Sequence, residues 1–286
     1  MKKTSQLAWL MIFLTVLSSG TTVPDSQTGH SIVQAMFEKT SEIKTVTYEL
    51  TKQERIDGKL IKQRSFTKIV SEPFQVYFKQ LYPKEGIEVL YPKGENNDKA
   101  LINPDGFPWV NLRLNPMGGT MRNDQHHTLF ESGFDHVASI LKFLCEKYRS
   151  TIDELIVYNG MVEYNGKTCY SVSMDNPHFK YIDYTIQENE SILDIAARFK
   201  LSEHMILEKN SSVNDYDDIV AGQVIQIPTD YSPKMLLYLD QESFIPLRMD
   251  VYDDLGLYEK YEYSEVSINP SFSEGEFSAD FPGYGF

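Results

Sequence analysis

Residues 235–268, which read MLLYLDQESFIPLRMDVYDDLGLYEKYEYSEVSI, decide the fold of this chain. Apolar and polar residues alternate in this stretch, so that Leu247, Met249 and Val251 share one face, and Tyr261 and Tyr263 repeat the same two-residue period. Such alternation is typical of strands with one buried face. The segment therefore predicts neighbouring strands of an antiparallel sheet.

The same period occurs earlier in the chain, where Phe74, Val76 and Phe78 alternate with polar neighbours. Asp57-Gly58 and Asn165-Gly166 favour tight hairpin turns, because these residue types tolerate the positive φ that such turns require. Helical spacing of apolar residues predicts amphipathic helices over 30–43 and 133–149. The predicted fold class is α+β, with a large curved antiparallel sheet and helices packed on it.

The strand period stops for about fifty residues and then resumes, which indicates an inserted domain over 181–231 within a host of 28–180 and 232–286. The insertion begins with a strand near 184–186 and ends with another near 224–227. Ser191 and Asp194 form a capping box before a first helix, and Ser202 caps a second. The predicted order of elements in this domain is βααβ.

The inserted segment, YTIQENESILDIAARFKLSEHMILEKNSSVNDYDDIVAGQVIQIP (184–228), resembles a LysM module across its whole length. The resemblance implies binding of N-acetylglucosamine-containing glycans, in bacteria usually peptidoglycan, in a groove between two loops. The corresponding candidates here are Asn189, Glu190, Ser191, Ile192, Asn210, Ser211, Ser212, Val213 and Ile219.

The first of these loops departs from the LysM pattern, since Asn189-Glu190-Ser191 stands where Gly-Asp-Thr or Gly-Asp-Ser is common. Asn tolerates the positive φ that Gly would supply, and Glu keeps the acidic group. The departure affects the groove more than the fold. The alternative is a module that only packs against its host or a protein partner.

The host resembles the bacterial family called domain of unknown function 1571, whose fold is similar to LolA-type lipoprotein carriers. Four pieces carry this resemblance: residues 74–103, 112–141, 237–266 and the terminal ADFPGYGF. The carrier fold implies a concave sheet that holds an apolar ligand such as a lipid. Candidate lining residues are Phe74, Val76, Phe78, Leu247, Met249 and Val251, although alternation alone leaves open which face is concave.

The N-terminus has the order of a secretory signal peptide, with Lys2 and Lys3 before an apolar run from Leu7 to Leu17 and small residues after it. That run is shorter than the ~20 residues of a membrane-spanning helix. We therefore expect residues 1–20 to be removed and the mature protein to be periplasmic or otherwise extracytoplasmic, with no membrane span.

The formal net charge is -14, and loss of the two lysines makes it about -16. This acidity makes nucleic acid an unsuitable partner. Cys145 and Cys169 would join in a disulfide in an oxidising compartment, or remain two buried thiols.

The sequence contains none of the common motifs for catalysis or phosphate binding, so we predict a protein that is not an enzyme and has no cofactor. His126 and His127 are adjacent, and on an extended segment their side chains would point to opposite faces. No metal site is therefore predicted.

The leading hypothesis is a non-catalytic envelope protein whose carrier-like domain binds an apolar molecule while the LysM module binds peptidoglycan or a related glycan. The alternative is a structural or assembly scaffold of the envelope that holds no small ligand.

Overall fold

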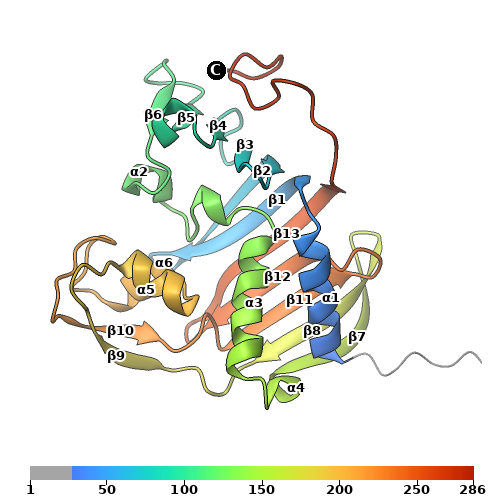
Figure 1. Ribbon diagram of the computed structural model, residues 1–286, viewed down its shortest axis with the longest axis vertical. Helices are drawn as coiled ribbons and strands as arrows, with labels where there is room; N and C mark the ends of the chain where they lie inside the picture. The colour runs from blue at the N-terminus through green and yellow to red at the C-terminus, as the bar shows by residue number, and fades with distance from the viewer. Residues whose placement is uncertain (1–27) are drawn as a thin grey trace, which may run out of the picture.

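The computed structural model describes residues 28–286, so the predicted signal peptide lies outside the described residues. Most of the chain forms one antiparallel sheet of eleven strands (Figure 1). Its strands are β1 (Thr45–Ile56), β2 (Lys59–Val70), β3 (Gln75–Tyr82), β4 (Glu88–Pro92), β5 (Ala100–Asn103), β6 (Leu112–Leu114), β7 (Ile156–Tyr164), β8 (Lys167–Asp175), β11 (Lys234–Asp240), β12 (Pro246–Asp253) and β13 (Gly256–Ile268). The order across the sheet is β6-β5-β4-β3-β2-β1-β13-β12-β11-β8-β7, which leaves it open between β6 and β7.

The two predicted hairpins are confirmed. Asp57 and Gly58 have φ values of 49° and 75° between β1 and β2, and Asn165 and Gly166 have the same pair of values between β7 and β8. Positive φ at both central residues is the geometry of a two-residue turn whose twist matches that of the flanking strands.

The helical elements are α1 (Gly29–Ser41), α2 (Gly119–Arg122), α3 (Asp135–Lys147), α4 (Ile152–Leu155), α5 (Ile192–Phe199), α6 (Glu203–Lys209) and the 3-10 turns η1 (Asn96–Asp98) and η2 (Leu129–Glu131). The predicted helices at 30–43 and 133–149 correspond to α1 and α3. These two helices lie across β8, β11, β12 and β13 (Figure 1). Ile32, Met36 and Leu141 are buried there against Val172 and Met235 of the sheet.

The remaining strands, β1 to β6, extend beyond α1 and α3. We call the sheet face that carries α1 and α3 the inner face and the opposite one the outer face. The C-terminal segment covers the outer face of β1 to β6. There Phe277 packs in a separate apolar cluster with Tyr77, Leu90 and Leu101 of the sheet. The ring of Tyr284 stacks on Tyr77, with 3.9 Å between centroids. The chain end is therefore fixed against the sheet.

The segment between β8 and β11 forms a small unit of β9 (Tyr181–Thr185), α5, α6 and β10 (Val224–Pro228), in which β9 and β10 pair antiparallel. Ser191 and Asp194 make the predicted capping box, and the Ser202 hydroxyl accepts from the Met205 amide. The predicted fold class, a large antiparallel sheet with packed helices and a small βααβ unit, is confirmed.

This βααβ unit has its own apolar core, which includes Ile192, Ile195 and Ile225. Its helix α6 nevertheless packs on the main sheet, because Met205 belongs to the main core. The Ser202 hydroxyl also lies 2.8 Å from the Tyr258 hydroxyl of β13. The unit and the main sheet thus share a packed interface.

Within residues 28–286, no helix combines the length and the apolar character that crossing a membrane requires.

Candidate functional site

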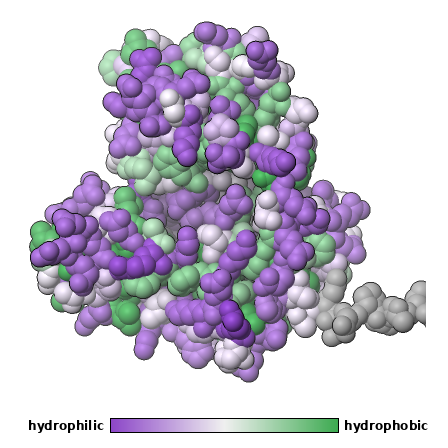
Figure 2. Space-filling view, viewed as in Figure 1, coloured by the Kyte–Doolittle hydropathy of each residue, from purple (hydrophilic) through white to green (hydrophobic). Residues whose placement is uncertain are grey.

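A cavity of about 450 Å³ opens on the inner face of the part of the sheet that α1 and α3 leave uncovered. Figure 2 shows the surface hollowed between the upper part of the molecule, where β3 to β6 lie, and the broader lower part. Alternate residues along parts of β1, β2 and β3 line this cavity, which follows from the two-residue period of strands. Half-buried apolar side chains on its wall include Leu50, Phe78, Ile87, Val89, Leu112 and Leu114.

The predicted lining residues divide into two groups. Val76, Phe78 and Met249 line the cavity. Phe74 instead lines a smaller hollow of about 100 Å³ beside it, and Leu247 and Val251 are buried without lining either hollow. Strand β12 runs from beneath the helices toward the cavity, so residues that share one of its faces can have different surroundings. Alternation predicts which residues share a face, but not that Met249 lines the cavity while Leu247 and Val251 do not.

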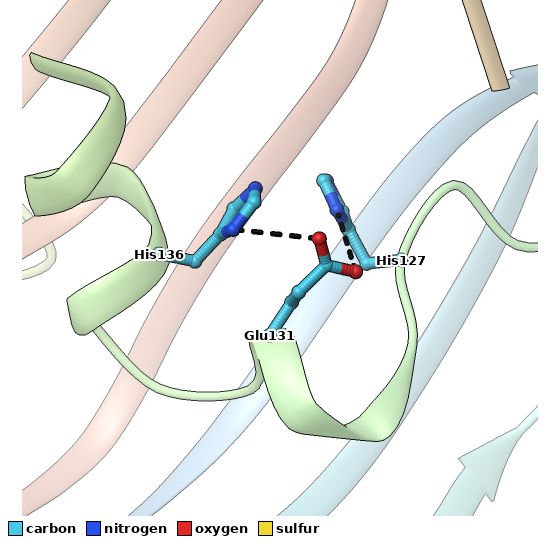
Figure 3. Close-up of side chains that lie close together, drawn as sticks. All are labelled: His127, Glu131 and His136. Carbon is cyan, nitrogen blue, oxygen red and sulfur yellow. Dashed lines mark ion pairs between the residues drawn. The ribbon is translucent and has the colours of Figure 1, made fainter. Parts of the chain in front are cut away.

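One end of the cavity is polar, and three of its lining side chains converge there: His127, Glu131 and His136 (Figure 3). His127 precedes η2, Glu131 ends it, and His136 lies in the first turn of α3. Glu131 Oε2 lies 3.6 Å from His127 Nδ1, and Oε1 lies 3.5 Å from His136 Nδ1. Both separations exceed an ordinary hydrogen bond.

A local motif holds Glu131 in place. The Thr128 amide donates to Glu131 Oε2 at 2.7 Å, and the Thr128 hydroxyl donates to the same oxygen at 3.1 Å. This capping box begins η2 and fixes the direction of the carboxylate.

Glu259 of β13 forms a second, fully buried layer behind His127. Its Oε2 lies 2.9 Å from His126 Nδ1 and 3.3 Å from His127 Nε2, while Oε1 accepts from the Tyr231 hydroxyl at 2.7 Å. The Tyr231 oxygen also lies 3.2 Å from His127 Nε2. Because Tyr231 donates to Glu259, its oxygen is an acceptor for His127, so Nε2 of His127 is the protonated nitrogen.

The charges in this cluster follow from burial and from neighbouring groups. Burial alone would lower the pKa of His127, but Glu259 and Glu131 raise it well above its usual value. Burial would raise the pKa of Glu131, but His127 lowers it to about 2. Burial and then the charge of His127 lower the pKa of His136 to about 4. At neutral pH the Glu131 carboxylate is therefore ionised and His136 is neutral.

This cluster differs from what the sequence indicated for His126 and His127. The pair lies in a bend rather than on an extended segment, and both rings contact Glu259. The interpretation that the two rings point to opposite faces was therefore wrong. His126 also stacks on His204 of α6, with 4.6 Å between ring centroids.

Helix α6 closes the cluster from the side of the βααβ unit. Arg122 of α2 donates to Glu203 Oε1 at 2.7 Å, and its guanidinium lies 3.6 Å from the centre of the Tyr216 ring. Arg122 and Glu203 are both buried. The loop that contains Tyr216 thereby contacts α2.

The first loop of the predicted glycan groove is held by internal contacts. Asn189 has a φ of 58°, the positive value for which Asn was expected to substitute for Gly. The Glu190 carboxylate accepts from the Tyr184 hydroxyl, the Gln187 amide and Arg198. Ser191 caps α5, and Ile192 is fully buried. Asn189 is the residue of this loop whose side chain is exposed.

The candidate residues of the second loop are also partly held inside the unit and partly exposed. The Asn210 side-chain amide donates to the carbonyls of Ile206 and Gln226, Val213 is buried, and Ile219 packs on the core of the unit. Ser211 and Ser212 are exposed. The Ile192 amide donates to the Tyr216 carbonyl at 3.4 Å, which joins the two loops.

The predicted disulfide does not form, because Cys145 and Cys169 are separate buried thiols. Cys145 packs in the main core with α3, where Tyr170, Val172 and Met174 of β8 face it. Cys169 precedes Tyr170 and so points to the other face of the sheet. Two cysteines on opposite faces cannot reach disulfide geometry.

The chain thus combines an open antiparallel sheet with a cavity of about 450 Å³ on one of its faces. A family model described as "Protein of unknown function (DUF1571)" matches residues 43–204, more than half of the chain, so the chain belongs to this family. A model described as "LysM domain" matches residues 184–228, the segment that runs from the end of β9 through α5 and α6 to the end of β10. Neither description names a catalytic activity.

Among solved structures, similar folds include the Mycobacterium tuberculosis lipoprotein LppX, with 10% identity, a TM-score of 0.42, and coverage of 85% of this chain and 97% of that one. The Pseudomonas aeruginosa MucA/MucB complex has a chain with 10% identity and a TM-score of 0.41 over 88% of this chain and 60% of its own. A putative outer membrane lipoprotein-sorting protein domain from Vibrio parahaemolyticus has 11% identity and a TM-score of 0.33 over 87% and 97%. Among curated proteins, none matches this sequence.

Proposed function

We propose that this protein binds an apolar small molecule in the cavity and is a binding protein rather than an enzyme. The cavity carries this proposal. Its volume of about 450 Å³ falls within the range of roughly 300 to 1,000 Å³ that is typical of small-molecule sites. The lining combines apolar side chains with polar ones, which include Lys52, Gln63 and Gln80 besides the histidine cluster, and so suits a molecule with an apolar body and a polar head, such as a fatty acid.

The location we propose for this activity is the cell envelope. The N-terminal order of positive, apolar and small residues supports export, and the LysM match supports contact with a wall glycan. A protein of this kind would hold its ligand outside the cytoplasm.

The fluorescent fatty acid cis-parinaric acid tests the cavity proposal. Val89 faces the cavity from β4, and the Val89→Trp substitution would fill part of the space that a ligand needs. The matched control is Val157→Trp on the edge strand β7, where the side chain is 43% exposed and does not line the cavity. We expect saturable binding by the unmodified chain and by Val157→Trp, and at least tenfold weaker binding by Val89→Trp.

Circular dichroism of each variant checks that the sheet still forms. Equal binding by the two tryptophan variants would place the probe elsewhere on the molecule. A complete lack of saturable binding by the unmodified chain would instead favour the scaffold alternative, in which no small ligand is held.

For the βααβ unit we propose weak binding of an N-acetylglucosamine-containing glycan, on the strength of the LysM match. The exposed side chains of Asn189, Ser211 and Ser212 are the candidate contacts, because the other candidate side chains are buried or bonded inside the unit. A single module offers no avidity, so the dissociation constant would be on the order of 10 to 1,000 μM.

Co-sedimentation with purified peptidoglycan sacculi tests this second proposal. Ser212→Trp would obstruct the loop, and Ser264→Trp on the exposed face of β13 is its matched control. We expect the unmodified chain and Ser264→Trp to sediment in part and Ser212→Trp to remain in the supernatant. Equal sedimentation of both variants, or recovery of the unmodified chain wholly in the supernatant, would count against glycan binding through this loop.

A further inference from the structure

We propose that His127, Glu131 and His136 bind a divalent transition metal ion, with Zn²⁺ the best fit, at the polar end of the cavity. This site stands whether or not the cavity takes an apolar ligand, because it rests on the three side chains and the groups that hold them.

The spacing of the three groups fits a metal better than it fits direct hydrogen bonds. The two histidine nitrogens lie 3.5 and 3.6 Å from Glu131 oxygens, and the three groups offer ligand atoms that all lie within 4.8 Å of one another. Ligand atoms of a tetrahedral zinc ion, at bond lengths of about 2.0–2.1 Å, lie roughly 3.3 Å apart. Small rotations of the side chains would therefore complete the coordination.

The unpaired nitrogen atoms point to the same conclusion. His127 Nδ1 is buried and has no hydrogen-bond partner, and the same is true of His136 Nε2. A buried polar atom without a partner costs free energy, so such atoms are rare in folded proteins. Coordination of a metal by His127 Nδ1 would remove one of these unpaired atoms.

A second layer of residues orients the proposed ligands. His127 presents its other nitrogen, Nε2, to Glu259 and Tyr231, which leaves Nδ1 directed at Glu131, where it can coordinate a metal ion once its proton is released. Thr128 holds Glu131 Oε2, which leaves Oε1 facing His136. Carboxylate-to-histidine-to-metal arrangements of this kind are the usual support for zinc ligands.

The donor set narrows the choice of ion. Two imidazoles and one carboxylate suit zinc and other first-row transition metals, whereas calcium and magnesium prefer oxygen ligands only. All three residues line the cavity, so the remaining coordination position faces the space where a ligand or water would lie. An anionic head group could occupy that position.

Isothermal titration of the untagged full chain with Zn²⁺, after treatment with a chelator and its removal, tests this proposal. We expect one Zn²⁺ per chain with a dissociation constant of about 1 μM or tighter. Glu131→Gln and His136→Ala should each weaken binding by more than about 100-fold, and Tyr231→Phe by about 10- to 100-fold through loss of the second layer.

The control is His178→Ala, which removes an exposed histidine outside the cluster and should leave the affinity unchanged. Binding of Co²⁺ to the unmodified chain adds a readout that needs no substitution, because tetrahedral Co²⁺ absorbs visible light strongly. The proposal is overturned if the unmodified chain takes up no stoichiometric Zn²⁺, if its Co²⁺ spectrum lacks a tetrahedral band, or if folded Glu131→Gln binds Zn²⁺ as well as the unmodified chain does. The cis-parinaric acid measurement on metal-free protein reports separately on the cavity.

Discussion

The two halves of the main sheet are covered from opposite sides, and their inner faces differ in chemistry. In the half formed by β7, β8, β11, β12 and β13, helices α1 and α3 cover the inner face and complete a dense core. In the half formed by β1 to β6, the C-terminal segment covers the outer face and the inner face borders the cavity. The helix-covered inner face is apolar, whereas the inner face that borders the cavity carries polar side chains such as Lys52 and Gln63 among its apolar ones, so the cover and the strand sequence change together.

The largest change in the free energy of unfolding should come from shortening a leucine side chain in the helix-covered half, compared with the same substitution in the half that borders the cavity. Leu141 of α3 is completely buried in the helix-covered half, whereas Leu114 of β6 is half-buried on the cavity wall. Leu141→Ala should lower the free energy of unfolding by about 2 to 5 kcal/mol, because it leaves a void in packed surroundings. Leu114→Ala should cost about 1 kcal/mol or less, because the side chain already borders open space. Urea denaturation measures both, and equal losses would contradict the distinction between the halves.

A smaller effect should follow when the contact between the main sheet and the βααβ unit is weakened. Arg122→Ala removes the buried ion pair with Glu203 and the contact with the Tyr216 ring, and should cost about 2 kcal/mol. This loss of unfolding free energy is smaller than for a buried pair whose two partners must stay charged. Burial and the charge of Glu131 raise the pKa of Glu203, so its carboxylate is protonated more easily when Arg122 is absent. The matched control, Arg113→Ala, changes an exposed residue of β6 and should stay within about 0.5 kcal/mol.

Denaturation followed both by circular dichroism and by tyrosine fluorescence checks the effect of Arg122→Ala. We expect one cooperative transition for the unmodified chain, since α6 contributes Met205 to the main core. Two separate transitions in the unmodified chain, or identical curves for the two arginine variants, would mean that the unit is only loosely attached.

The smallest effect concerns the cover on the outer face of the cavity half. Tyr284→Ala removes the stacking on Tyr77 and the hydrogen bond from its hydroxyl to the Glu276 carbonyl. We expect a loss of about 1 kcal/mol, which is the scale of an aromatic pair. Tyr252→Ala, at a half-buried tyrosine of β12, serves as the comparison and should cost less. If the two losses are the same in thermal denaturation, the C-terminal segment does not stabilise this half of the sheet.

Local signals in the sequence predicted most of the fold. The Asp57-Gly58 and Asn165-Gly166 turns need only two adjacent residues to specify a hairpin, and the Ser191 capping box specifies the start of α5 within four residues. Periodicity placed α1, α3, β3 and the strands within 235–268 for the same reason, whereas the short strands β5 and β6 were not predicted. Each of these features depends on neighbours in the chain, which a single sequence displays.

Features that depend on tertiary placement were not predictable in the same way. Alternation grouped Leu247, Met249 and Val251 on one face but could not show that only Met249 reaches the cavity. Cys145 and Cys169 lie on elements that pack together, yet their side chains are separated by the sheet. The turn η2 directs the chain toward α3 and so brings together His127, Glu131 and His136. No sequence motif predicted that turn.

Native mass spectrometry of the protein purified without detergent is the most direct test of the proposed cavity function, because it detects a bound small molecule by its mass. We expect part of the unmodified chain, and of Val157→Trp, to carry one bound small molecule that dissociates on activation and extracts into organic solvent. Val89→Trp should carry none. Folded, unmodified protein that shows no adduct and acquires none after incubation with oleate would contradict the proposal that the uncovered half of the sheet holds an apolar ligand.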